Sequence, residues 1–185
     1  MFATCNNELD RVKYNFTTIQ PKFEEIKIWD ANTTRLLKVL KSTKYPTDKT
    51  VFRLYATSIC FSHDSKFMVA IISQGIKNVI NVWDIESGEI VKIIKNDQND
   101  MYVICSPVDN NIFATCGSRK DKWAKFRVWS ILDKRTLKTI EDKEAKDVVA
   151  IQFSPDGKKI ITVNNNCQLN TWNIQTKNET KDESK

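Results

Sequence analysis

One loop of this chain combines residue types that suit molecular recognition. A tryptophan is surrounded by four basic residues, in the order Arg119, Lys120, Lys122, Trp123 and Lys125. Cations beside an exposed aromatic ring fit an acidic peptide, an acidic cytoskeletal surface or a single-stranded nucleic acid, whose bases stack on such rings. A turn whose tryptophan packs on a neighbouring loop explains the same residues. The loop is therefore a candidate contact site for a partner, and both interpretations stay open.

Catalytic, metal and cofactor chemistry finds little support in the motifs. We find no nucleophile motif, glycine-rich phosphate loop or paired carboxylates, so no catalytic or cofactor-binding residue is predicted. The single histidine, His63, falls in an expected turn without clustered Cys/His ligands, and a zinc site is not expected. The acidic residues Glu86, Asp97, Asp100 and Asp109 are interpreted as solvated turn residues. The sequence argues against an enzyme.

Composition narrows the compartment and the partners. The net charge of +6 would attract nucleic acid, anionic lipid or an acidic protein surface, but lysines and acids are interspersed along most of the chain. No run of eighteen apolar residues is present and the first residues do not resemble a signal peptide, so we expect a cytoplasmic protein without a membrane span. Cys60, Cys105 and Cys116 lie in apolar runs, and we expect them to be reduced and buried.

Four segments with a shared ending show how the chain is organised. Each alternates apolar and polar residues and ends in Trp plus a small polar residue, at 26–30, 80–84, 126–130 and 169–173. Successive tryptophans stand 54, 46 and 43 residues apart. A strand that ends in Trp and recurs about every 40 to 50 residues is typical of propeller blades.

A second shared element precedes the tryptophan in three repeats. An apolar strand runs into Ser and then into a turn of Pro, Asp, Asn or Gly residues, at 59–66, 103–110 and 151–158. These residue types favour tight turns. A second apolar strand, the Trp strand and a shorter strand follow, and no segment has a sustained helical period. The predicted fold class is all-β, with four-stranded antiparallel sheets.

At this level of detail the chain resembles the WD-repeat β-propeller family over nearly its whole length. The residues that carry the resemblance are Trp29, Asp30, Trp83, Asp84, Trp129, Trp172 and the turn 153–157. It implies one radial sheet per repeat, with each tryptophan on the third strand and packed between blades. The family often has a Gly-His pair whose histidine joins a hydrogen-bond network with the tryptophan. Because His63 lies in a turn, that network is not expected in its usual form.

The repeats predict a propeller segment at 1–174, with units at about 1–41, 55–95, 101–141 and 147–174, and a disordered polar tail at 175–185. The segment 2–6 repeats almost unchanged at 113–117, so the first unit begins on its second strand, and the last unit ends after its Trp strand. About three and a half blades result, with sheet edges and faces uncovered. The chain is then part of a larger propeller, a small four-bladed ring, or a segment completed by a partner or a second copy.

The function that these features favour is a non-catalytic scaffold that binds other proteins, including proteins with acidic surfaces, through loop ends and blade edges. General likeness to the propellers of large cytoskeletal or ciliary scaffolds favours a place in such an assembly. The alternative is a nucleic-acid-associated propeller that binds RNA or DNA through the basic loop 119–125. Neither function requires a cofactor.

Overall fold

The computed structural model describes residues 2–6, 25–41, 55–74, 77–96, 100–117, 124–133, 136–142 and 148–174. All regular secondary structure in these ranges is β-strand, arranged in four antiparallel sheets. The predicted all-β class is therefore confirmed. Within the same ranges no helix is long and apolar enough to cross a membrane.

The strands pair in the order in which they occur in the sequence. The first sheet contains β1 (Phe2–Asn6), β2 (Glu25–Trp29) and β3 (Leu36–Lys41). The second contains β4 (Tyr55–Phe61), β5 (Phe67–Gln74), β6 (Lys77–Asp84) and β7 (Ile90–Asn96). The third contains β8 (Tyr102–Cys105), β9 (Ile112–Gly117), β10 (Ala124–Ser130) and β11 (Thr136–Asp142). The fourth contains β12 (Val148–Phe153), β13 (Lys159–Asn164) and β14 (Leu169–Asn173).

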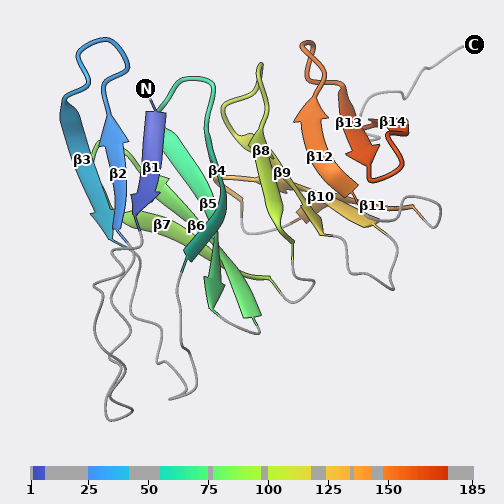
Figure 1. Ribbon diagram of the computed structural model, residues 1–185, viewed down its shortest axis with the longest axis horizontal. Coiled ribbons are helices and arrows are strands. Elements are labelled where there is room, and N and C mark those ends of the chain that lie inside the picture. Colours follow the sequence, from blue (N-terminus) through green and yellow to red (C-terminus); the bar gives the residue numbers. More distant parts are fainter. Residues whose placement is uncertain are drawn as a thin grey trace, which may run out of the picture.

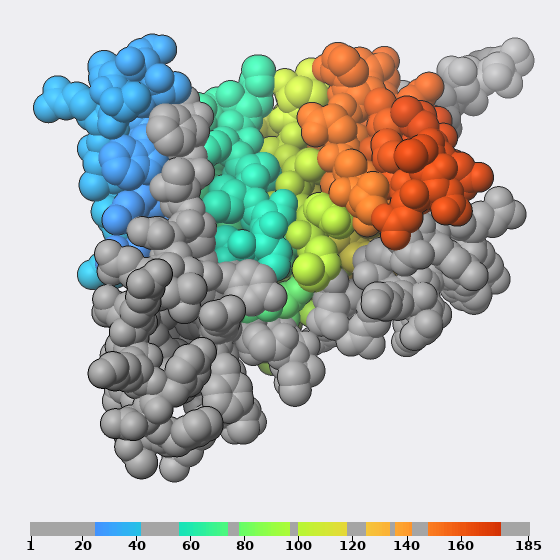
Figure 2. Space-filling model, in the orientation of Figure 1, coloured from blue at the N-terminus to red at the C-terminus, as the bar shows by residue number. Residues whose placement is uncertain are grey.

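The four sheets follow one another in chain order and form a propeller-like fold (Figure 1). Strand β8, the first of the third sheet, contacts both β4 and β12, the first strands of the sheets on either side. The last strands β3, β7 and β11 form the opposite edges of the first three sheets. In Figure 2 the sheets abut as successive bands of surface, from the first in blue to the fourth in red.

The turn between β12 and β13 shows why these sequences form hairpins. The Ser154 hydroxyl accepts a hydrogen bond from the backbone N–H of Lys159 (2.9 Å) and donates one to the Asp156 carboxylate (2.5 Å). Gly157 adopts the left-handed conformation, with φ of 68°, which suits a residue without a Cβ atom. The Ser154 hydroxyl holds the pKa of Asp156 below its ordinary value. The turn after β4 repeats this arrangement with Ser62 and Asp64 (2.7 Å).

Three apolar clusters fill the spaces between consecutive sheets. We call the side of a sheet that faces the following sheet in chain order its forward face, and the opposite side its back face. The Trp strand contributes two apolar residues to the forward face of each of the first three sheets: Ile26 and Ile28, Ile80 and Val82, and Phe126 and Val128. Each of these side chains is at most 1% exposed. Burial of such a side chain stabilises a fold by about 1.5–3 kcal/mol, so the sheets are held together mainly by this packing.

Candidate functional site

The predicted basic loop lies mostly outside the described residues. This is the case for Arg119, Lys120, Lys122 and Trp123. The described member, Lys125, lies on β10, and its Nζ is 2.6 Å from a carboxylate oxygen of Glu141 on β11. Both side chains are partly exposed, so this pair is a surface ion pair. The loop remains a sequence prediction.

The four signature tryptophans lie at corresponding places in the four sheets. Trp29, Trp83, Trp129 and Trp172 stand at or near the ends of β2, β6, β10 and β14. Trp83 is fully buried. Trp129 stacks on Phe113 of the same sheet, with ring centroids 6.1 Å apart. Trp172 stacks on Phe126 of the preceding sheet, with centroids 5.5 Å apart. Trp172 therefore connects the fourth sheet to the third.

The acidic partners Asp30 and Asp84 act as turn residues. A carboxylate oxygen of Asp30 accepts hydrogen bonds from the backbone N–H groups of Thr33 (2.7 Å) and Asn32 (2.9 Å). Asp84 accepts from the N–H of Ser87 (2.8 Å) in the same way. These backbone donors hold the pKa of both carboxyls below their ordinary value. Both residues therefore position the turn that leads to the outer strand.

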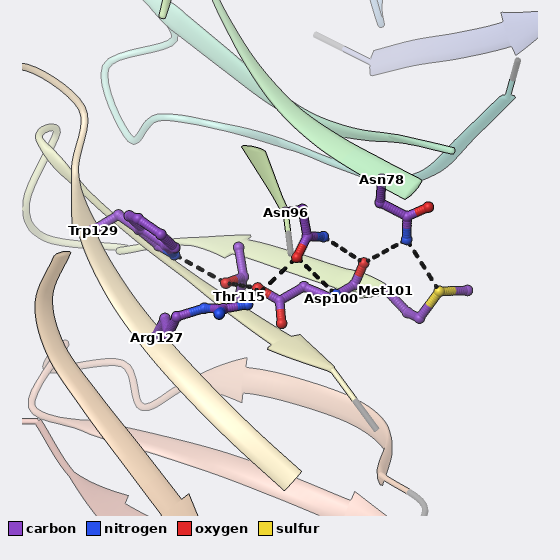
Figure 3. Close-up of polar contacts among 7 residues, drawn as sticks. All are labelled: Asn78, Asn96, Asp100, Met101, Thr115, Arg127 and Trp129. Carbon is purple, nitrogen blue, oxygen red and sulfur yellow. Dashed lines mark hydrogen bonds and ion pairs between the residues drawn. The ribbon is translucent and has the colours of Figure 1, made fainter. Parts of the chain in front are cut away.

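A buried polar network lies between the second and third sheets, and Figure 3 shows its members. One carboxylate oxygen of Asp100 accepts hydrogen bonds from the Thr115 hydroxyl (2.5 Å) and from the Arg127 guanidinium (2.5 Å). The Thr115 hydroxyl accepts in turn from the indole N–H of Trp129 (2.9 Å). The Arg127 guanidinium also lies over the Trp129 ring, 5.6 Å from its centroid. In this sheet an aspartate thus ends the hydrogen-bond chain that begins at the tryptophan.

The expectation that Asp100 is a solvated turn residue is wrong. Its side chain is 0% exposed, because the guanidinium and the Thr115 hydroxyl replace the water that a carboxylate otherwise requires. Glu86, Asp109 and His63 are exposed in the turns where they were expected, and Asp97 lies outside the described residues. The available signal was Arg127, a cation between two apolar residues of a Trp strand.

Two asparagines fix the backbone around Asp100. The side-chain amide of Asn96 donates to the Asp100 carbonyl (3.0 Å), and its oxygen accepts from the Asp100 N–H (3.0 Å). Asn78 on β6 donates to the same carbonyl (3.1 Å). These two residues belong to the second sheet, whereas Thr115 and Arg127 belong to the third. The network therefore ties two sheets together, and its carboxylate is held by structural donors.

A lysine on each outer strand reaches across to the next sheet. Lys38 donates to the carbonyls of Ile85 (2.8 Å) and Glu86. Lys92 donates to the carbonyls of Ser130 (2.7 Å) and Asp133, and its burial lowers the pKa of its ammonium group.

The third member of this series is Lys138, which donates to the carbonyl of Asn173 (3.0 Å). We did not predict these inter-sheet contacts, although a sequence signal existed. Each of the three lysines stands nine residues after the signature tryptophan of its repeat.

The predicted state of the cysteines requires a correction. Cys60 on β4 and Cys105 on β8 form a disulfide, with their Cα atoms 5.8 Å apart. The reason is that the two strands are neighbours and present these side chains to each other. Cys116 is a free, buried thiol, as expected, and burial raises its pKa. Cys167 is free and exposed.

Metal ligation has no candidate in the described part of the chain. Nowhere in it do three or more His, Cys, Asp or Glu side chains form a group that could hold an ion. Part of the described surface is apolar. On the outer strands of the first two sheets, Leu37, Val91 and Ile93 are 54%, 53% and 42% exposed.

Comparison with known proteins gives partial matches. No family model matches the chain. Over 94 residues it is 32% identical to the putative BTB/POZ domain-containing protein R773 of Acanthamoeba polyphaga mimivirus. The matched segment covers 50% of this chain and 18% of that protein. A chain in the crystal structure of the mitotic checkpoint complex superposes with a TM-score of 0.62 at 14% identity, over 83% of this chain and 43% of that chain. The chain thus spans less than half the length of either protein, and the structural likeness concerns the fold.

Proposed function

We propose that this chain is a non-catalytic propeller segment of the WD-repeat type that binds other proteins through blade edges and loop ends. One observation carries the proposal. The outer strands of two neighbouring sheets, β3 and β7, are edge strands. They expose three apolar side chains, those of Leu37, Val91 and Ile93. An edge strand offers unpaired backbone groups as well as apolar side chains, and proteins use this combination to bind partners.

The polar groups of the described residues support the same proposal. Several groups connect strands or sheets and so serve the architecture: the buried carboxylate of Asp100, the tryptophans Trp83, Trp129 and Trp172, and the three inter-sheet lysines. Charged and apolar groups that remain at the surface suit contact with another protein. The match to a BTB/POZ domain-containing protein and the likeness to a chain of a multi-protein complex support protein partners in general.

The basic loop 119–125 belongs to the proposal as a second contact, directed at acidic surfaces on the partner. We further propose a cytoplasmic location, with a cytoskeletal or ciliary assembly as the setting. The partner then touches the edge strands through apolar groups and the loop through charge. These two contributions differ in their response to salt, which weakens only the second.

The test compares variants of each contact in binding to an identified partner. Proteins that co-purify with the tagged chain from its own cells are identified, and the binding of each purified candidate is measured. Val91→Asp with Ile93→Asp is expected to weaken binding about tenfold or more, because it places charges in an apolar contact. Lys95→Gln, on the same strand, serves as the control and should leave binding unchanged.

Nucleic acid is the alternative outcome of the same purification. Binding of RNA or DNA that weakens steeply with salt and is abolished by Arg119→Glu with Lys120→Glu would replace the proposal. Protein binding that survives both the outer-strand and the loop variants would also contradict it.

A further inference from the structure

We propose that the forward face of the fourth sheet binds the back face of the first sheet of a second copy of this chain. The inference deepens the proposed function, on which it rests, by naming one partner and its site. Each described sheet after the first packs on the forward face of the sheet before it.

Corresponding residues identify the forward faces. On the fourth sheet Ile161 pairs with Thr171, and Val163 pairs with Leu169. The same places on the third sheet are held by Ala114 with Val128 and by Cys116 with Phe126. On the second sheet they are held by Val69 with Val82 and by Ile71 with Ile80. Three sheets thus present the same four positions toward the sheet that follows.

The side chains at these four positions are more exposed on the fourth sheet than on the second and third sheets. All eight residues at these positions on the second and third sheets are at most 1% exposed, because the following sheet covers them. On the fourth sheet Leu169 is 64% exposed, Thr171 is exposed, and Ile161 and Val163 are half-buried. The fourth sheet stands at the end of the row, and no described strand packs against this side (Figure 1). The forward face of the fourth sheet is therefore mainly apolar, like the covered forward faces of the second and third sheets, but it is not buried.

The chain itself carries the complementary face. Trp83 and Trp172 lie on back faces and pack on the sheet before them. Trp29 holds the same place on the first sheet, where it pairs with Leu36. Trp29 is half-buried and Leu36 is 46% exposed. A tryptophan-bearing back face and an apolar forward face thus stand at opposite ends of one chain.

The proposed contact is head-to-tail, because it joins two different faces. Two copies form a closed ring if each places its fourth sheet on the first sheet of the other, with the copies related by a two-fold axis. Each copy carries a net charge of +6, so charge repulsion opposes the association. Salt screens this repulsion, so it should strengthen the association between the copies. An acidic partner bound at the basic loop would respond in the opposite direction.

Sedimentation equilibrium of the full chain over about a hundredfold range of concentration tests the proposal. Self-association that increases with salt is expected. Leu169→Asp should raise the dimer Kd about tenfold or more, since it places a charge on the forward face, and Leu169→Ala should raise it less. Leu132→Asp is the matched control, because Leu132 is a similarly exposed leucine (72%) in the turn after β10 of the third sheet, away from both proposed faces, and it should leave the Kd unchanged.

Circular dichroism confirms that each variant is folded before its mass is interpreted. A chain that stays monomeric at every concentration, or a folded Leu169→Asp variant that associates like the wild type, overturns the inference. The proposed function fails separately, when no other protein binds the outer strands or the loop.

Discussion

Asp100 illustrates how one residue can differ from what its sequence neighbourhood indicates. It follows a polar stretch and reads as a surface turn, yet it lies buried between two sheets with Arg127, Thr115 and the backbone-binding Asn96. Thr115 and Arg127 stand 15 and 27 positions after Asp100 in the sequence, so only the folded chain brings them to its carboxylate. Asn96 is a local partner, four positions before Asp100. The cation within a Trp strand was visible in the sequence, but its partner was not.

Removal of the guanidinium should reveal the importance of this pair. Arg127→Met is expected to lower the free energy of unfolding by about 3–5 kcal/mol, because it leaves the Asp100 carboxylate buried without its counter-ion. Lys125→Met removes the surface pair with Glu141 and should cost less than about 1 kcal/mol. Urea denaturation measures both. Equal losses in the two variants would show that Asp100 does not depend on Arg127.

The turn aspartates predict a dependence of stability on acid pH. The pKa values of Asp64 and Asp156 lie below the ordinary value of 3.8 in the folded chain, because Ser62 and Ser154 donate hydrogen bonds to the ionised carboxylates. The unfolded chain then binds protons first, so the free energy of unfolding falls as the pH drops through and below 3.8. Asp64→Asn with Asp156→Asn should reduce this fall. Denaturation curves from about pH 5 to about pH 3 test the expectation, and an unchanged slope in the double variant contradicts it.

At the scale of the elements, hairpins were predictable because their causes are local. Serine followed by Pro, Asp or Gly indicated the turns, and alternating apolar residues indicated the strands beside them. The structure places β12, the turn at Gly157 and β13 where this pattern indicated them. Contacts between hairpins were not predictable in this way. The Cys60–Cys105 disulfide and the three lysine bridges depend on which strands become neighbours in space.

Two glycines offer a matched test of turn geometry. Gly157 and Gly88 both adopt positive φ, and a Cβ atom at either position brings backbone strain of about 1 kcal/mol. At Gly157 the added atom would also collide with the Val108 side chain of the preceding sheet, whereas at Gly88 it meets the flexible end of Lys38 at 3.3 Å. Gly157→Ala should therefore destabilise the chain more than Gly88→Ala. Thermal unfolding compares them, and the reverse order would contradict the packing described between the third and fourth sheets.

The lysine that joins the second and third sheets should contribute measurably to stability. Lys92→Met removes hydrogen bonds to the carbonyls of Ser130 and Asp133 and is expected to cost about 1–2 kcal/mol. Lys95→Met, an exposed lysine on the same strand, should change stability by less than about 0.5 kcal/mol. Urea denaturation of the two variants measures both changes in the free energy of unfolding. A loss at Lys95 that matches the loss at Lys92 would argue against the inter-sheet role.

At the scale of the whole molecule, the recurring tryptophans were sufficient to indicate stacked antiparallel sheets. The all-β fold follows from the same period, and the superposition with a chain of the mitotic checkpoint complex agrees with it. The candidate site was less predictable. The composition of the basic loop indicated a contact site, and the incomplete repeats indicated uncovered sheet faces. The residues that form the exposed forward face of the fourth sheet were not predicted, because they follow from the burial of corresponding residues in successive sheets.

The central claim is that the sheets stack through forward and back faces and leave the forward face of the fourth sheet open to a partner. Hydrogen–deuterium exchange of the dilute, monomeric chain, followed by mass spectrometry of its peptides, tests this claim most directly. Amides of β9 and β10, in a sheet covered on both faces, should exchange more slowly than those of β13 and β14, and association should slow β13 and β14. Equal protection of the two sheets in the monomer, or no change at β13 and β14 on association, would contradict the account.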